Sequence, residues 1–434
     1  MSNTTVILAH GLGGRTDLPV PLWIALTAGT AAVIISFIFV AALWTEPRLR
    51  GAAGGRAIPA AIETILDSPT TRAALRALGL AVFAVMLAES WLGPSASNEN
   101  PAPTWFYVWF WVGLVFVSVI GGPVYRLANP LRTAGTIVHE LIGRPEHAEL
   151  LAKLRYKPAV LGLLVFLWLE LVSPHRDDAR VVATFITVYS LVNIAAGAWF
   201  GPKWFDRGDG FEVYFSLIAR LAPLGRRSDG RLVVRNPLDG LLAGPADKGL
   251  TPVVLTVLGS TAFDGITRLG FWSKMDSAAK ASELRPWPSI LLGTTGLIVT
   301  ILLIAGLYAS TIWAMERFVK PETGSAFDLF VHTLIPIMLG YTIAHYFSFA
   351  LFQGQAGYRL IWGDSTIDYT VVGTATIAFV QIIGIVAGHI VAVFSAHDQS
   401  VSVLRPGFIK FGQIPMMGLM ISYTMVGITL VSAG

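Results

Sequence analysis

Ten long apolar stretches constrain this chain more than any other feature of its sequence. They cover residues 20–44, 74–93, 104–124, 158–174, 181–200, 250–270, 287–313, 327–352, 369–397 and 412–432. About 20 apolar residues is the length that an α-helix needs to cross the hydrocarbon core of a bilayer. Backbone polar groups find no water there, so each crossing segment has to be helical. The sequence therefore predicts an all-α, polytopic transmembrane helix bundle of about ten spans.

The composition agrees with a membrane protein and excludes several other classes. Of the 434 residues, 54% are hydrophobic and 13% are charged, with a mean hydropathy of +0.64. Soluble domains carry about twice this share of charge. The chain has no Cys, which excludes disulfides and thiolate metal ligands. Nothing in it resembles a nucleic-acid module, so the expected partners are the lipid bilayer and other membrane subunits.

Basic residues collect in three of the loops between the apolar stretches, 45–73, 125–157 and 201–249. The loop 94–103 carries no basic residue, and 175–180 carries two. Cytoplasmic loops of membrane proteins hold the excess of Lys and Arg. We therefore expect a protein of the bacterial cytoplasmic (inner) membrane, with these three loops inside and the N-terminus outside.

The same pattern divides the chain into three regions. Residues 1–200 form an N-terminal transmembrane half of about five spans, 201–249 form a basic cytoplasmic loop, and 250–434 form a C-terminal half. We expect short amphipathic helices in the cytoplasmic loops. One of them, FEVYFSLIARL at 211–221, is expected to lie on the membrane surface. The stretch 250–270 is either a full span or a re-entrant segment.

Two neighbouring stretches of the C-terminal half carry four of the eight histidines. Ionisable side chains at membrane depth are costly and usually functional. The short turn between the stretches predicts two antiparallel helices. Imidazole and carboxylate groups suit copper, iron or zinc, and a His pair can also hold a haem. The predicted metal ligands are Asp328, His332, His345, His389 and His397. Helix packing or a proton relay is the alternative role for these histidines.

Three carboxylates lie within or at the ends of other predicted spans. Glu89 and Glu170 fall near the outer ends, where water is expected to reach them. Asp264 lies in the sequence GSTAFDG, between Gly259 and Gly265. Glycines at such positions permit close approach of a neighbouring helix or a break in the helix. The alternative for Asp264 is the N-cap of a half-helix.

Several motifs together resemble a known family. They are GDGFEVYFSLIARLAPLGRRSDGRLVVRNPLDGL at 208–241, LGSTAFDG at 258–265, PIMLGYTIAHYFSFALFQGQ at 336–355 and GHIVAVFSAHD at 388–398. They resemble polytopic actinobacterial membrane proteins identified as fenitrothion hydrolases. The resemblance implies cleavage of an organophosphate ester, which needs a metal-activated water or another strong nucleophile. Asp264 and Asp398 are the general bases that this chemistry would use.

A second resemblance concerns metal ligands only. The Asp-x3-His-x12-His spacing of Asp328, His332 and His345 is similar to the copper-ligand spacing in the C subunit of particulate methane monooxygenases. It implies copper bound between the helices of 327–352 and 369–397.

These observations support three hypotheses about function. The first is a membrane-embedded metalloprotein, either a metal-dependent hydrolase or a copper or haem oxidoreductase. The second is a multi-pass transporter of an ion, a metal or a small molecule, in which Asp264 and the histidines form the path. The third is an accessory subunit of a membrane complex. Histidines that converge on one point favour the metalloprotein over the other two.

Overall fold

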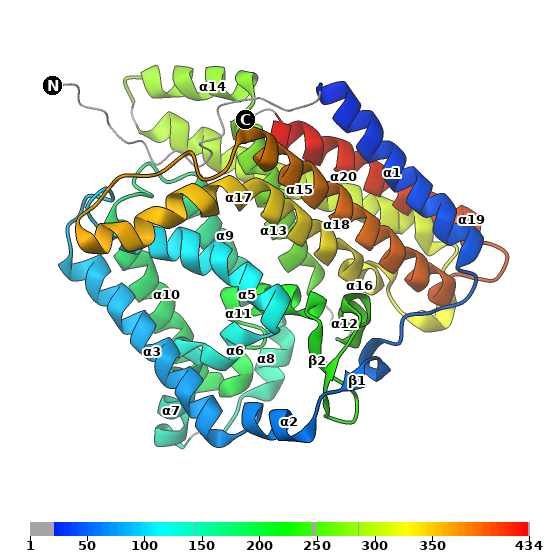
Figure 1. Cartoon of the computed structure of the whole chain (residues 1–434), viewed down its shortest axis with the longest axis horizontal. Helices are drawn as coiled ribbons and strands as arrows, with labels where there is room; N and C mark the ends of the chain where they lie inside the picture. Colours follow the sequence, from blue (N-terminus) through cyan, green and yellow to red (C-terminus); the bar gives the residue numbers. More distant parts are fainter. Residues whose placement is uncertain (1–20, 144, 245–248, 285, 433–434) are drawn as a thin grey trace.

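The computed structural model of the chain describes residues 21–143, 145–244, 249–284 and 286–432. These residues form a bundle of α-helices with one small β-sheet at its lower edge (Figure 1). The prediction of an all-α, polytopic bundle is confirmed.

Eight helical segments are long and apolar enough to cross a membrane in the described part of the chain. They are α1 (Leu22–Leu43), α3 (Pro69–Leu92), α4 to α5 (Ala102–Gly121), α10 (Ala179–Phe200), α15 (Trp287–Glu316), α16 to η7 (Ala326–Trp362), α18 (Thr374–Val403) and α19 to α20 (Ile409–Ser432). Such a set of helices makes this a multi-pass membrane protein whose apolar surfaces contact lipid.

The other two predicted spans are helices, but short ones. They are α9 (Lys157–Leu171) with 15 residues and α13 (Thr251–Thr267) with 17 residues. At 1.5 Å per residue, neither reaches the roughly 30 Å thickness of a bilayer core. The ten predicted spans therefore correspond to eight full-length segments and two shorter helices.

The short helix α13 is far more buried than the helices α3 and α15. Fourteen of its 17 residues are buried, and it packs against α9, α15, α17 and α20. In contrast, α3 has a single buried residue, and only 17% of an apolar 18-residue stretch of α15 is buried. A helix that is apolar all round and contacts protein on all sides belongs to the core. Hence α13 lies at the centre of the bundle, and α3 and α15 face lipid.

The helices α17 (Ile335–Arg359) and α18 pack antiparallel, as the sequence predicts. Glycines set their separation: a Cβ added at Gly388 would lie 2.7 Å from the carbonyl oxygen of Pro336, and one added at Gly340 would meet the carbonyl oxygen of Gly384. Small residues of this kind let helix backbones approach closely.

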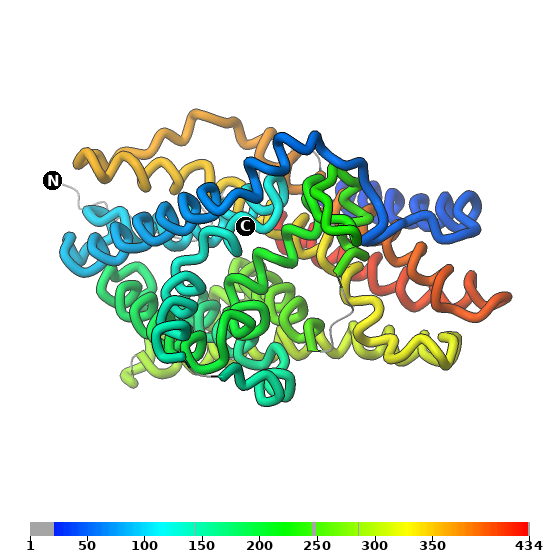
Figure 2. Tube along the Cα trace, turned by 90° about the horizontal axis from the view of Figure 1, so that it is seen from below, coloured from blue at the N-terminus to red at the C-terminus, as the bar shows by residue number. Residues whose placement is uncertain are grey.

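The other end of α17 joins the C-terminal half to the N-terminal half. Trp105 and Trp109 donate hydrogen bonds from their indole nitrogens to the carbonyl oxygens of Gly357 and Gly354, at 2.5 and 3.1 Å. In Figures 1 and 2 the gold end of α17 accordingly reaches across to the cyan helices. This helix therefore contacts both halves of the bundle.

The three basic loops meet at one edge of the bundle. There, β1 (Arg56–Ala57), β3 (Leu232–Val234) and β2 (Leu224–Arg226) form an antiparallel sheet in the order β1-β3-β2. Figure 1 shows this sheet with α2 (Ala60–Leu66) and α7 (Pro130–Ile142) on the opposite edge from α14 (Gly270–Ala281). One common edge for the three loops is the arrangement that the charge pattern requires.

The segment 211–221 lies inside the protein instead of on the membrane surface. It forms α11 (Gly210–Ile218), in which every residue except Ser216 is buried, and it packs against α9 and α5 (Leu114–Gly121). Its carboxylate is paired internally: Glu212 accepts hydrogen bonds from Arg132 and Asn129. Among the described helices, α2 and α14 have no buried residue and lie at the surface instead.

The remaining elements are short connecting segments, except for the 19-residue helix α20 that ends the last span. They are η1 (Gly51–Ala53), α4 (Ala102–Thr104), the π-helix η2 (Trp105–Gly113), α6 (Val124–Ala128), α8 (Ala148–Leu154), η3 (Pro202–Trp204), η4 (Ala219–Leu221), α12 (Pro237–Ala243), η5 (Pro321–Thr323), α16 (Ala326–Leu329), η6 (Val331–Leu334), η7 (Leu360–Trp362), α19 (Ile409–Gly412) and α20 (Ile414–Ser432).

Candidate functional site

Three charged or titratable side chains meet inside the bundle and are called the buried triad below. Nε2 of His345 contacts Oδ2 of Asp264 and lies 3.0 Å from Nη2 of Arg268. The same Arg268 nitrogen is 3.7 Å from Oδ2 of Asp264. His345 is 2% exposed and Asp264 is 5% exposed. The triad therefore places a carboxylate, an imidazole and a guanidinium together away from bulk water.

The short length of α13 explains where the triad lies. Asp264 is in the last turn of this helix, and Arg268 is its C-cap residue. The helix ends beside the middle of α17, where His345 lies. The alternative that Asp264 is the N-cap of a half-helix is therefore wrong. A helix C-terminus carries partial negative charge, which favours Arg268 at this position and disfavours an ionised Asp264 without a cationic partner.

The two glycines of the GSTAFDG segment hold neighbouring helices close, as predicted. A Cβ added at Gly259 would lie 2.5 Å from Cα of Ile301 on α15. A Cβ added at Gly265 would lie 2.8 Å from Cβ of Leu430 and 3.0 Å from the hydroxyl oxygen of Tyr341. Asp264 is thus fixed between α15, α17 and α20.

The hydrogen-bond chemistry of the triad allows two positions for one proton. An imidazole nitrogen either donates a hydrogen bond or accepts one. With hydrogen on both ring nitrogens, His345 donates from Nε2 to the carboxylate of Asp264. With hydrogen on Nδ1 only, Nε2 accepts from Asp264, which then carries the proton. The same three side chains thus support both arrangements with little movement.

A second carboxylate lies next to the triad. Glu170, in the last turn of α9, is 0% exposed and accepts a hydrogen bond from the hydroxyl of Tyr346 at 3.3 Å. Its Oε2 atom has no partner within the described residues. The charges of Glu170 and Asp264 interact. The expectation that water reaches this end of the span is wrong, because helices cover Glu170 on all sides.

An aromatic wall encloses Glu170. The stretch that opens the third span forms the π-helix η2, and its Trp111 stacks on Tyr214 of α11 at 4.6 Å between ring centroids. Trp111 also meets the edge of Phe166 at 4.7 Å. π-Helices are rare and frequently mark functional sites. Here Phe106, Tyr107 and Trp111 of the π-helix are buried, whereas Trp109 is 43% exposed.

Sequence reasoning missed Arg268, Tyr341 and Tyr346. Arg268 follows Asp264 by four residues, the spacing at which an acidic and a basic side chain pair on a helix. That spacing was a readable signal for this residue. The two tyrosines gave no comparable signal, because aromatic residues are common throughout the apolar stretches.

Two of the predicted metal ligands lie near the start of the α16 to η7 segment. Oδ1 of Asp328, in α16, accepts a hydrogen bond from the Thr251 hydroxyl at 3.1 Å. His332 lies in η6, is 6% exposed, and its Nε2 atom has no partner in the described ranges. Phe330 separates the two short helices, so Asp328 and His332 do not share one regular helical face.

The other predicted residues of α18 make different contacts. Nδ1 of His389 is 2.8 Å from the carbonyl oxygen of Ile385. Nδ1 of His397 is 2.8 Å from Oε1 of Gln413, and its Nε2 is 2.8 Å from the carbonyl oxygen of Trp44. Asp398 accepts hydrogen bonds from the segment after α1. These contacts tie α18 to α1 and to the start of α20.

The predicted ligands are therefore spread over several places in the bundle. Only His345 contacts another candidate residue, Asp264. Among the residues that the structure describes, no three His, Asp or Glu side chains form a group that could hold a metal ion. Copper, iron, zinc or haem binding stays a prediction.

Comparison of the chain with protein-family models, with curated proteins and with solved structures finds no match. The resemblance to proteins identified as fenitrothion hydrolases therefore stays a prediction. The geometry of the buried triad and Glu170 is the basis for assigning a function.

Proposed function

We propose that this protein is a proton-coupled transporter of the bacterial cytoplasmic membrane, with its basic edge inside and its N-terminus outside. The buried triad carries the coupling protons, with Glu170 as a second carrier. The observation behind this proposal is the position of His345, between a carboxylate and a guanidinium in the centre of the bundle.

The cost of burying these groups supports a functional role. Charged groups inside a membrane protein are rare, and chains of Asp, Glu and His are typical of proton relays in pumps and transporters. Arg268 pairs with Asp264, whereas Glu170 has no ion-pair partner within the described residues, although the charge of Arg176 acts on it. An unbalanced buried carboxylate is costly. Binding a proton at Asp264, Glu170 or His345 removes the imbalance, so this cluster is suited to take up and release a proton.

The shape of α9 and α13 supports the same proposal. Both helices are shorter than a span, and each carries its carboxylate near its C-terminal end. Transporters commonly place their ion and substrate sites where interrupted helices end near the middle of the membrane. A substrate site beside the triad fits this arrangement.

A metalloprotein is the second candidate, and one contact favours it. Asp264 and His345 touch each other, and both are ligand types that suit zinc, copper or iron. An ion bound there would serve as a hydrolase or an oxidoreductase centre, with Glu170 as the nearest further carboxylate. Metal analysis of the purified protein separates this candidate from the first.

The proposal is tested in vesicles loaded with a pH-sensitive dye. Purified full-length protein is reconstituted, a membrane potential is imposed, and candidate solutes are then added one at a time. We expect proton movement above that of empty vesicles, driven by the potential or by a transported solute. Asp264→Asn and His345→Gln are expected to lower the rate about a hundredfold, the low end of the effect of losing a proton-transfer group.

The control is Asp364→Asn, because Asp364 lies in the turn between α17 and α18 with 45% of its side chain exposed. It removes a carboxylate outside the bundle and is expected to leave the rate unchanged. Wild-type vesicles that behave like empty ones under every condition refute the proposal. Stoichiometric metal that disappears in His345→Gln supports the metalloprotein instead.

A further inference from the structure

A small cavity lies beside the triad, between α13, α15, α17, α18 and α20. Its volume is about 30 Å³, and its polar lining residues are Tyr341, His389 and Tyr423. A cavity needs roughly 10–15 Å³ of such volume and two to four polar partners to hold a water molecule. This one has space and polar groups for a water.

Two of the polar groups at the cavity are unused. The Tyr423 hydroxyl donates to the carbonyl oxygen of Ile304 at 2.9 Å. In contrast, Nε2 of His389 and the hydroxyl of Tyr341 have no hydrogen-bond partner in the described part of the chain. His389 is 1% exposed and Tyr341 is 7% exposed. A buried polar atom without a partner is costly, so each of them favours a bound water.

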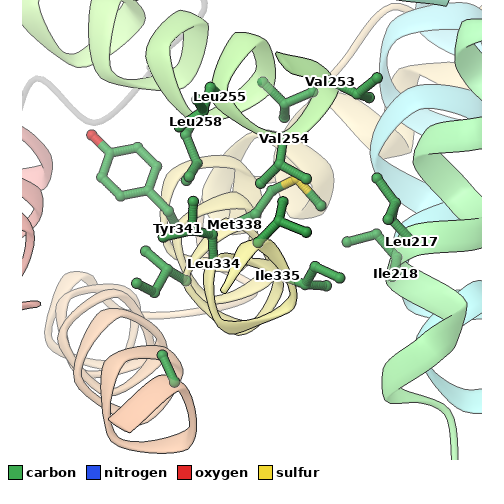
Figure 3. Close-up of a cluster of buried hydrophobic side chains, with 14 of the residues drawn as sticks. Leu217, Ile218, Val253, Val254, Leu255, Leu258, Leu334, Ile335, Met338 and Tyr341 are labelled. Atoms are coloured by element: carbon green, nitrogen blue, oxygen red, sulfur yellow. The ribbon is translucent and has the colours of Figure 1, made fainter. Parts of the chain in front are cut away.

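Tyr341 connects this cavity to the triad. Its ring stacks on the ring of His345, with centroids 5.9 Å apart and planes 13° apart. Its hydroxyl lies beside Gly265, the residue that follows Asp264. Figure 3 shows the Tyr341 side chain extending from α17 next to Leu258 of α13. One side chain thus contacts both the triad and the cavity.

The surroundings of His389 favour proton binding as its role. The cavity lining contains no charged side chain within the described residues, and its other members are aliphatic or glycine. The titratable groups that face His389 are Tyr341 on α17 and Tyr423 on α20. Among these groups, only the imidazole has an unshared ring nitrogen that can bind a proton, because Nδ1 donates to Ile385 and Nε2 has no partner in the described part of the chain. A proton in this cavity is therefore held by His389.

We infer that His389 is a second proton-binding position, joined to the buried triad through Tyr341 and water held in this cavity. Its ligand is a water molecule, which hydrogen-bonds Nε2 of His389 and the Tyr341 hydroxyl. Nδ1 of His389 donates to the carbonyl oxygen of Ile385, so a proton bound at Nε2 makes the imidazole cationic. This proton passes to the water as the water gives another proton to the Tyr341 hydroxyl and the hydroxyl gives its own toward Asp264, which leaves His389 neutral and Asp264 protonated. This inference rests on the proposed function, because it extends the path of the same protons.

The first test measures water at His389 without any transport assay. Hydrogen–deuterium exchange at C2 of the imidazole ring is followed by mass spectrometry on the purified full-length protein in D₂O. Gly427→Ala places a methyl group toward the cavity, with its Cβ 3.4 Å from the Tyr341 ring. Gly418→Ala, on the same helix α20, is the matched control, because a Cβ there meets no atom within 4 Å.

We expect measurable exchange at His389 in the wild type, a severalfold slower rate in Gly427→Ala, and the wild-type rate in Gly418→Ala. Absence of exchange at His389, or an unchanged rate in Gly427→Ala, overturns the inference. Because exchange does not depend on a substrate or a proton gradient, its result is independent of whether the vesicle assay detects transport.

The second test uses the vesicle assay with His389→Gln and Tyr341→Phe, in which all three triad residues are intact. Both variants are expected to move protons severalfold more slowly than the wild type. Wild-type rates in both variants overturn the role of His389 while leaving the triad as the proton carrier. In that case Asp264→Asn would lose transport, whereas His389→Gln and Tyr341→Phe would keep the wild-type rate.

Discussion

Asp398 holds the chain segment that follows α1 through three hydrogen bonds to one carboxylate oxygen. The indole nitrogen of Trp44 donates to it at 2.9 Å, and the backbone nitrogens of Arg48 and Leu49 donate at 2.6 and 3.3 Å. The neighbouring His397 contacts the carbonyl oxygen of Trp44. The end of α18 thus fixes the connection between α1 and the three-stranded sheet β1-β3-β2.

We predict that Asp398→Ala destabilises the protein and leaves proton movement per folded molecule unchanged. Removing the carboxylate leaves three buried or half-buried donors without an acceptor, at a cost of about 3 kcal/mol. Thermal unfolding in mild detergent, followed by circular dichroism, measures this loss. Asp398→Asn keeps an oxygen acceptor and is expected to cost less. A large loss of transport in a stable Asp398→Asn protein would support the catalytic role expected from the sequence.

The pairing of Arg268 with Asp264 gives a second prediction. Arg268→Ala leaves a buried carboxylate without its cation and is expected to destabilise by about 3–5 kcal/mol. Asp264→Asn removes the charge that Arg268 compensates, so the double variant is expected to be less destabilised than the sum of the two single changes. The coupling free energy from this double-mutant cycle is expected to exceed about 0.5 kcal/mol. Additive effects would show that the two side chains do not interact.

The sequence was sufficient for the class of fold and for most of the helices, because hydropathy and helix length are local properties. It could not distinguish α13 from α15, since an apolar helix looks the same whether it contacts lipid or protein. This is why 250–270 was counted as a span, although α13 lies in the core.

The site was harder to predict because its members are far apart in the chain. Asp264 and His345 were both candidates, but 81 positions separate them, and only the packing of α13 on α17 brings them together. His389 and His397 share a helix with no bend that would aim both toward His345. Their rings contact Ile385 and Gln413 instead. Which face of α18 meets which neighbour depends on the tertiary packing.

The glycine contact between α17 and α18 gives a third prediction. Gly340→Ala is expected to destabilise by about 1–3 kcal/mol, the usual cost of overpacking, because its Cβ would meet backbone atoms of α18. Gly306→Ala on α15 is the matched control, since a Cβ there meets nothing within 4 Å. It is expected to be neutral or slightly stabilising. Equal unfolding temperatures for the two variants would contradict the close packing.

The last prediction concerns the pH dependence of the edge sheet, where two carboxylates hold the β2–β3 hairpin against α2. The backbone N–H of Leu232 and the Arg231 guanidinium lower the pKa of Glu63 below its ordinary value of 4.5. Arg226 and then Arg72 lower the pKa of Asp67 below 3.8.

A carboxylate with a lowered folded-state pKa stabilises the fold above its unfolded-state pKa, and this contribution is lost as the pH falls through the folded-state value. We therefore expect the hairpin to be fully protected at pH 7 and to loosen below about pH 4, the range where these groups take up protons. Amide hydrogen exchange at residues 232–234, corrected for the intrinsic rate at each pH, measures the change. Glu63→Gln is expected to reduce protection already at pH 7, whereas Glu283→Gln, an exposed carboxylate outside the sheet, leaves it unchanged. Protection that is independent of pH in the wild type would show that the sheet is held without these ion pairs.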